Sequence, residues 1–211
     1  MFDYRNKRRY HLVWLVIYTI LFGWLTFLVA RHSPVITALD RTIQGWLIPF
    51  TNPQVTKVVV FLTNLGSPTM GVILGLIVCI TLLLLHNRAT FLWGAVFLIS
   101  GNLINSVVKH IVHRTRPSDK LVPQGGFSYP SGHTLSTGLL VMLLLALIVS
   151  QIHNRAVHDL LVCLGYLWIV VIALTRIYLH VHFPSDTIGA GLLLGIIWNV
   201  TLLCYPYHQF Q

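Results

Sequence analysis

Charged residues are scarce in this chain of 211 residues, and glutamate is missing altogether. Only 9% of the residues are charged, with 14 Lys and Arg and 5 acids, whereas soluble domains carry roughly 25% charged residues. In contrast, 55% of the residues are hydrophobic, and they fall in runs long enough to cross a bilayer. These proportions exclude a soluble globular domain and predict an integral membrane protein.

The formal net charge of +9 does not indicate a nucleic-acid partner. The cations flank apolar runs instead of forming one basic stripe, a placement that suits anionic lipid and phosphate.

Cysteine is rare as well, with Cys79, Cys163 and Cys204 each inside an apolar stretch. No CxxC and no zinc-type spacing occurs, so neither a disulfide framework nor a metal site is implied. We expect all three to be small buried hydrophobic residues.

Six apolar runs predict an all-α, polytopic membrane protein with a single domain over residues 1–211. Runs of about 20 residues match a hydrocarbon core of ~30 Å. Residues 31–67 mix polar and apolar types, and we expect short amphipathic helices along the interface, with Trp46 and Phe50 at headgroup depth. The predicted membrane spans are residues 11–30, 68–85, 90–108, 133–152, 160–174 and 184–205.

Basic residues before the first span predict the orientation of the chain. Arg5, Lys7, Arg8 and Arg9 form its densest basic flank, which places the N-terminus in the cytoplasm. Six spans return the C-terminus to the same side. The opposite face carries more cations in total, but several of them have a role in a proposed site. We therefore expect a cell-membrane protein with both termini cytoplasmic and its active site at the extracytoplasmic interface.

The first segment with chemical potential is residues 109–117. Lys109 and Arg116 are seven residues apart, so both cations project from one side if the helix continues to Pro117. The alternative is a basic flank that anchors the span on lipid headgroups.

The second segment, residues 127–133, opens the fourth span. Ser131 is placed as an N-cap, and the free amides after it, with Gly132 allowing close approach, form an anion site. His133 lies in the first turn, within reach of a bound anion. An ordinary helix start that contains a histidine is the competing interpretation.

The third segment, residues 175–186, pairs a histidine with a carboxylate. Asp186 lies four residues after His182 and can reach one imidazole nitrogen, which leaves the other free as a base or nucleophile. His180 competes for this role, but only His182 has both the five-residue gap from Arg176 and the three-residue gap to Asp186.

Read in order as K-x6-R-P, P-S-G-H and R-x5-H-x3-D, the three segments resemble the type 2 phosphatidic acid phosphatase superfamily. That family includes membrane lipid phosphate phosphatases, among them phosphatidylglycerophosphatase B-like and undecaprenyl-diphosphatase-like bacterial members, and its soluble relatives include vanadium haloperoxidases. The motifs span residues 109–186, and the six-span layout extends the resemblance to most of the chain. One departure is Thr175, where the family usually has Ser before the arginine.

The resemblance implies a mechanism that needs no metal or other cofactor. His182 would attack phosphorus to form a phosphohistidine, Asp186 would hold its imidazole, and His133 would protonate the leaving alkoxide and then activate water. The groups that would bind the phosphoryl oxygens are Lys109, Arg116, Ser131, Gly132 and Arg176. His110, His113 and Arg114 are extra basic residues, which we interpret as headgroup contacts or a simple flank.

The implied substrate is a membrane lipid phosphate, and phosphatidate, phosphatidylglycerol phosphate and a polyprenyl diphosphate all fit. Two other functions stay open: a vanadate-dependent peroxidase using the same residues, and a non-enzymatic lipid or anion transporter. No sequence feature specifies an oligomeric state.

Overall fold

The computed structural model describes residues 2–84 and 88–204, and this part of the chain contains helices and no strand. The predicted span ends at residues 85 and 205 lie outside the described residues. The helices are α1 (Phe2–Ala30), α2 (Pro34–Leu47), α3 (Pro53–Leu65), α4 (Pro68–Leu84), α5 (Arg88–Val112), α6 (Gly132–Leu147), α7 (Arg155–Tyr178) and α8 (Pro184–Cys204), with single 3-10 turns η1 (Ile48–Phe50) and η2 (Val149–Gln151).

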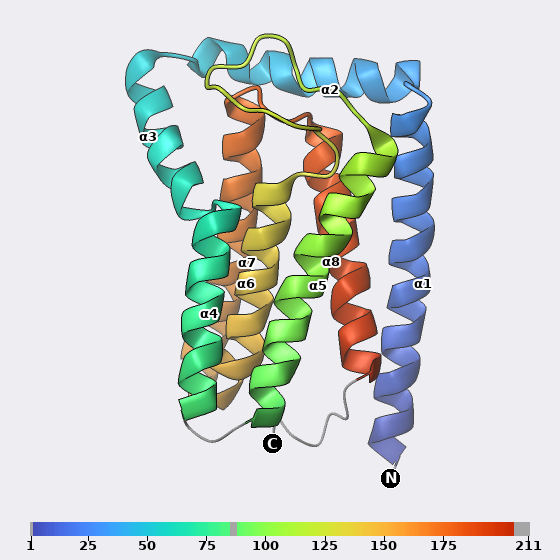
Figure 1. Cartoon of the computed structure of the whole chain (residues 1–211), viewed down its shortest axis with the longest axis vertical. Helices are drawn as coiled ribbons and strands as arrows, with labels where there is room; N and C mark the ends of the chain where they lie inside the picture. The colour runs from blue at the N-terminus through green and yellow to red at the C-terminus, as the bar shows by residue number, and fades with distance from the viewer. Residues whose placement is uncertain (1, 85–87, 205–211) are drawn as a thin grey trace.

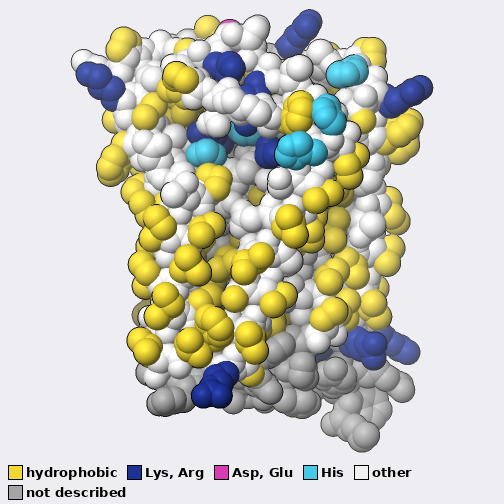
Figure 2. Space-filling view, in the orientation of Figure 1, with side chains coloured by type: hydrophobic (Ala, Val, Ile, Leu, Met, Phe, Trp, Pro, Cys, Tyr) yellow, Lys and Arg dark blue, Asp and Glu magenta, His cyan; other side chains and the backbone are white. Residues whose placement is uncertain are grey.

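Six stretches of the described residues are long and apolar enough to cross a membrane, which confirms the predicted all-α, six-span fold. Many large apolar side chains point outward from them, and hydrophobic residues cover the body of the molecule in Figure 2. The stretches are Asn6–Ala30, Pro53–Thr81, Arg88–Val112, Gly132–Gln151, Arg155–Tyr178 and Pro184–Cys204.

Helix α6 lies at the centre of the bundle, in contact with α4, α5, α7 and α8 (Figure 1). Its Leu135, Leu139 and Leu143 are fully buried. Close approach requires small residues: a Cβ at Gly138 would lie 2.4 Å from Cδ2 of Leu194 on α8, and one at Gly101 of α5 would lie 2.6 Å from Leu139. Glycine at helix crossings is a common packing device in membranes, because backbones can then approach closely.

The segment predicted to lie along the interface divides into two different helices. Helix α2 crosses one end of the bundle, as predicted, whereas α3 runs steeply from that end toward α4 (Figure 1). The prediction was wrong for α3, because Pro53–Thr81 is apolar enough to act as one span with a break at Gly66 and Ser67.

The cysteine prediction holds for one residue of three. Cys79 is buried in the core, but Cys163 and Cys204 are exposed on the outer surface of the bundle. An apolar run places a residue in the membrane without specifying whether it faces protein or lipid, so the sequence pattern missed this difference.

The bundle has two distinct ends, and the chain order assigns the sequence motifs to one of them. Helix α1 begins and α8 ends at the lower end in Figure 1. The end of α5, the 113–131 loop, the start of α6, the end of α7 and the start of α8 all lie at the upper end under α2. All three predicted segments therefore meet at the upper end.

Candidate active site

The residues singled out in the sequence come together at the upper end of the bundle. Figure 2 shows histidine and basic side chains gathered there, above the apolar body. His133, in the first turn of α6, interacts electrostatically with four of them: Lys109, Arg116, Arg176 and His182. Three different helices and two loops thus contribute to one cluster.

His182 and Asp186 form the pair that the four-residue spacing predicts. The His182 Nδ1 lies 3.3 Å from Asp186 Oδ2, and both residues are buried. If Nδ1 carries the proton and donates to the carboxylate, Nε2 has its lone pair free. Burial lowers the pKa of His182 to about 4, although Asp186 acts in the opposite direction, so the imidazole is neutral at physiological pH.

Arg116 reaches His182 by a route that the sequence did not predict. Helix α5 ends at Val112, and His113 adopts a left-handed backbone with φ 53°, so Arg116 lies in the loop and not two turns along the helix. Its Nη1 lies 3.0 Å from His182 Nε2 and also donates to the Val181 carbonyl. The expectation of a continuing helix was wrong, but the two cations still converge.

Oxygen atoms of the 113–131 loop accept hydrogen bonds from the cations. Lys109 Nζ donates to the Phe127 carbonyl at 2.9 Å and to the Ser128 carbonyl at 3.2 Å. Arg116 donates to the carbonyls of Gly125, Gly126 and Phe127 at 3.0–3.1 Å. These two cations therefore face a set of acceptor oxygens supplied by the loop.

Arg176, in the last turn of α7, is almost fully buried at 2% exposure. Its Nη1 donates to Thr63 Oγ1 and its Nη2 to Gln124 Oε1, both at 2.9 Å. Its buried Nε has no hydrogen-bond partner among the described residues. A buried donor without an acceptor is costly, so this guanidinium is suited to receive an anion.

The start of α6 has the N-cap that the sequence predicts. Ser131 is the N-cap and its Oγ accepts from the Thr134 amide at 3.5 Å, while its own amide donates to the Asp186 carbonyl at 3.0 Å. A Cβ at Gly132 would lie in ordinary van der Waals contact, 3.6 Å from Asn105 and 3.9 Å from Lys109, so Gly132 lies directly beside Lys109. His133 has no hydrogen-bond partner in the described part of the chain, so its ring nitrogens are available to a ligand.

Arg114 is the residue that sequence reasoning assigned wrongly. It is buried at 9% exposure, so it is not a headgroup contact. Its Nη1 donates to Asp186 Oδ1 and its Nη2 to Asp40 Oδ2, both at 2.6 Å. Asp40, on α2, also accepts from the backbone amide and the hydroxyl of Ser185. Arg114 therefore links α2 to the start of α8 through two carboxylates with no exposure.

Asp186 receives further donors on its second oxygen. Ser128 Oγ and the Phe183 amide both donate to Oδ2, beside the His182 contact. A carboxylate held by this many donors keeps a fixed orientation and stays ionised. The orientation of His182 thus depends on residues from the loop and from α8 itself.

The remaining basic and hydroxyl residues have other contacts. His180 is buried and its Nδ1 lies 2.5 Å from Asp119 Oδ2, so it is paired with a different carboxylate than His182. The Thr175 hydroxyl donates to the Ile172 carbonyl of its own helix at 2.6 Å. His110 and His113 are exposed and pack edge-on against Phe127.

Ligands for a metal do not gather anywhere in residues 2–84 and 88–204. No group of three or more His, Cys, Asp or Glu side chains in that part of the chain is arranged to hold an ion. Most of the charged groups at the upper end are instead cations, and the carboxylates of Asp40, Asp119 and Asp186 are each paired with a basic side chain.

Comparison with known proteins identifies the family. The model of the PAP2 superfamily matches residues 90–210, more than half of the chain. The chain belongs to the PAP2 superfamily. The resemblance inferred from the three motifs is therefore confirmed.

Individual relatives agree with this assignment. The chain is 28% identical over 178 residues to phosphatidylglycerophosphatase B of Bacillus subtilis (strain 168), an alignment that covers 82% of this chain and 86% of the relative. It is 31% identical over 128 residues to an undecaprenyl-diphosphatase of Sulfolobus acidocaldarius, covering 55% of this chain and 56% of the relative.

One solved structure has the same fold. The crystal structure of a transmembrane PAP2 type phosphatidylglycerolphosphate phosphatase from Bacillus subtilis superimposes with a TM-score of 0.73 at 22% identity. The match covers 90% of this chain and 92% of the other. This likeness extends the shared fold to nearly the whole six-span bundle.

Proposed function

We propose that this protein is a membrane lipid phosphatase that removes a phosphate from a lipid phosphate or a polyprenyl diphosphate. The observation that carries the proposal is the cluster at the upper end, where Lys109, Arg116 and Arg176 surround two histidines, one of them paired with a carboxylate. The names of the PAP2 relatives, a phosphatidylglycerophosphatase and an undecaprenyl-diphosphatase, support a lipid substrate.

A group of residues that we call the phosphate cradle would bind the phosphoryl group. The cradle consists of Lys109, Arg116 and Arg176 together with Ser131 and Gly132 at the N-terminus of α6. Phosphoryl transfer depends mainly on positioning and on neutralising spread negative charge. Three cations supply that charge, and the free amides of a helix N-terminus favour an anion. The unpartnered Nε of Arg176 is one donor ready for a phosphoryl oxygen.

His182 is the proposed nucleophile. Its Nε2 lone pair would form the bond to phosphorus while the bond from phosphorus to the lipid oxygen breaks, giving a phosphohistidine and an alkoxide. Asp186 would hold the Nδ1 proton and stabilise the positive charge that develops on the ring. Because Arg116 Nη1 lies 3.0 Å from Nε2, this guanidinium must move onto the phosphoryl oxygens before attack.

His133 is the proposed proton carrier. As an imidazolium it would give a proton to the leaving alkoxide, and as a neutral base it would then take a proton from the water that attacks the phosphohistidine. Hydrolysis returns His182 and releases inorganic phosphate. Its place among the cradle cations, with both ring nitrogens available within the described structure, suits this role.

The reaction as proposed requires no metal ion, since the cradle cations take the place of Mg²⁺ as charge neutralisers. Excess EDTA should then leave the rate unchanged, whereas orthovanadate, which resembles pentacoordinate phosphorus, should inhibit. A strict requirement for Mg²⁺ would contradict the scheme.

The proposal includes one domain over residues 1–211 and a defined orientation. Packing of α1 along α8 joins the first and last described helices in one bundle. The basic flank at Arg8 and Arg9 supports cytoplasmic termini, with the active site on the extracytoplasmic side. A reporter that is active only in the cytoplasm, fused to the N-terminus, would test the orientation.

The decisive experiment is to trap the covalent intermediate. Purified protein is incubated with a ³²P-labelled lipid phosphate and quenched, and the label should be acid-labile and base-stable. His182→Ala should lose both the label and the turnover. The matched control is His110→Ala, an exposed histidine at the same end, which should keep both. Label retained in His182→Ala would refute the assignment.

A further inference from the structure

A second site lies in the half of the molecule remote from the phosphate cradle. A cavity of about 280 Å³ opens between α1, α6, α7 and α8. Along α8, its lining residues run from Gly191 to Asn199, which lie roughly 8–20 Å beyond Asp186 at 1.5 Å per residue. No residue of the phosphate cradle lines the cavity, so the cavity is distinct from the candidate active site.

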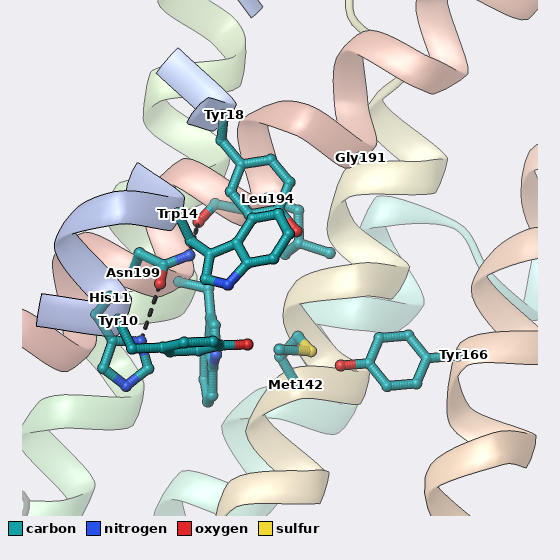
Figure 3. Close-up of a pocket in the computed structure, with 11 residues that line it drawn as sticks. Tyr10, His11, Trp14, Tyr18, Met142, Tyr166, Gly191, Leu194 and Asn199 are labelled. Atoms are coloured by element: carbon teal, nitrogen blue, oxygen red, sulfur yellow. Dashed lines mark hydrogen bonds between the residues drawn. The ribbon is translucent and has the colours of Figure 1, made fainter. Parts of the chain in front are cut away.

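Aromatic side chains form a large part of its wall. Tyr10, Trp14 and Tyr18 come from α1, Tyr166 from α7 and Trp198 from α8. Tyr10 and Tyr166 are half or more exposed, so the cavity opens on the surface that faces lipid. In Figure 3 their hydroxyl groups point toward each other across the space beside Met142.

The polar groups of the cavity are mainly donors without acceptors. The hydroxyls of Tyr10, Tyr18 and Tyr166 make no hydrogen bond with any other described residue. In contrast, the His11 Nδ1 lies 2.9 Å from Asn199 Oδ1, and Asn199 Nδ2 donates to the Gly195 carbonyl (Figure 3). The paired His11 and Asn199 close the polar end, and the phenols remain for a ligand that offers acceptors.

Two cations, Lys7 and Arg8, directly precede the cavity residues of α1. Lys7 precedes Tyr10, His11 and Trp14 by three, four and seven residues, so it shares their face of α1. Arg8 follows directly and is exposed. A ligand seated on the aromatic wall would therefore meet cations at its outer end.

We propose that this cavity binds an anionic phospholipid from the leaflet opposite the phosphate cradle, as a resident lipid and not as a substrate. The groups along the cavity follow the order of the groups in such a lipid. The cations would bind the phosphate, the tyrosine hydroxyls would donate to the ester carbonyls, and the apolar aromatic wall would contact an acyl chain. Aromatic residues with one polar end are typical of the membrane–water interface.

Gly191 provides a test that leaves the rest of the fold in place. It lines the cavity, and a Cβ at this position would meet no atom within 4 Å, so Gly191→Leu adds its side chain in the open space of the cavity. Gly23→Leu is the matched control, because Gly23 is also exposed, helical and free of neighbours within 4 Å, but lies outside the cavity.

Native mass spectrometry of the purified protein, titrated with phosphatidylglycerol, measures the lipid that is retained. Gly191→Leu should weaken the apparent Kd by about tenfold or more, because the added side chain overfills the cavity, while Gly23→Leu should match the wild type. Both variants should hydrolyse a soluble aryl phosphate at the wild-type rate, which shows that they are folded. Equal Kd values for Gly191→Leu and the wild type would overturn the proposal.

The anionic preference has its own measurement. Phosphatidylglycerol should bind more tightly than phosphatidylcholine with the same acyl chains, and Lys7→Gln should reduce this difference by about fivefold. Arg88→Gln removes an exposed cation at the same end of the bundle and should leave the difference unchanged. Equal affinity for the two lipids in the wild type would refute an anionic ligand.

Discussion

Arg114 offers the sharpest test of how the candidate active site is held together. Its guanidinium bridges Asp40 on α2 and Asp186 on α8, and neither carboxylate has any exposure. Replacing it by methionine keeps an unbranched side chain but leaves both carboxylates without their cation. Because Asp186 positions His182, the substitution should affect catalysis as well as stability.

The magnitude follows from the burial of the pair. Removing one partner of a buried ion pair costs about 3–5 kcal/mol, since the remaining charge is uncompensated. Arg114→Met should therefore lower the free energy of unfolding by ~3–5 kcal/mol. Arg114→Lys keeps the charge but cannot reach Asp40 and Asp186 together, because an ammonium lacks the planar fork. A hydrogen bond to a charged group contributes about 1.5–3 kcal/mol, so kcat should fall by roughly 10- to 150-fold.

Stability is measured by unfolding in mixed detergent micelles, and kcat is measured with a soluble aryl phosphate. Arg41→Met is the matched control, since Arg41 is the exposed neighbour of Asp40 on α2. Asp40→Asn combined with Arg114→Met should be less damaging than the sum of the single changes, because one of the two uncompensated charges is then removed. The reasoning fails if Arg114→Met unfolds and turns over like Arg41→Met, or if Arg114→Lys is fully active.

Four further predictions rest on the described contacts. Burial lowers the pKa of His182 to about 4, so the acid limb of the kcat/KM profile should lie near pH 4; a limb near 6.5 would contradict a neutral buried nucleophile. The same pKa shift links stability to pH. Between pH 6.5 and 4, His182 takes up a proton in the unfolded chain but not in the folded chain, so the free energy of unfolding should fall as the pH drops through this range. Gln124→Ala frees Nη2 of Arg176 from its loop partner and should tighten orthovanadate inhibition about fivefold, or ~1 kcal/mol, whereas Gln54→Ala should have no effect. Thr175→Ser should change kcat by less than about twofold, because the hydroxyl is engaged with its own helix; a large gain would instead indicate that the methyl group crowds the phosphate.

The three motifs predicted the cluster because their spacings reflect local geometry. A carboxylate in the first turn of a helix can reach back to the residues just before it, and Asp186 does so, to the Phe183 amide and the His182 ring. The N-cap at Ser131 was likewise readable from its position before an apolar run. Roles such as nucleophile and proton carrier remain predictions that kinetics must test.

The ion pair between Arg114 and Asp40 was missed because the two residues are 74 positions apart in the chain. A single sequence does not identify the two partners of such a long-range contact. One indication was available: Ile36, Asp40 and Gln44 follow each other at intervals of four on α2, and all three are buried. A polar pair on the buried stripe of an amphipathic helix indicates a network beneath it.

The seven-residue gap between Lys109 and Arg116 shows how a correct motif can have a wrong geometric explanation. Two helical turns would have placed the cations on one side, but α5 ends at Val112 and His113 turns the chain. The cations meet because the loop folds back, with the Ser128 amide donating to the Arg114 carbonyl. Backbone turns of this kind depend on tertiary contacts that hydrophobic periodicity does not report.

The loop contacts also bear on how the proposed phosphatase selects its substrate. Lys109 and Arg116 are held by backbone carbonyls of residues 125–128, and Arg176 by the side chain of Gln124. Burying three cations without acceptors would be costly, so the loop oxygens stabilise the cradle when no substrate is bound. A phosphoryl group can replace the loop oxygens because its own oxygens accept the same hydrogen bonds, and their negative charge makes these hydrogen bonds stronger.

A neutral lipid has no oxygens of comparable charge, and displacing the loop would leave the cations unpaired. In the proposed mechanism, this exchange selects for phosphate, and the apolar tails are left to the helices that face the membrane.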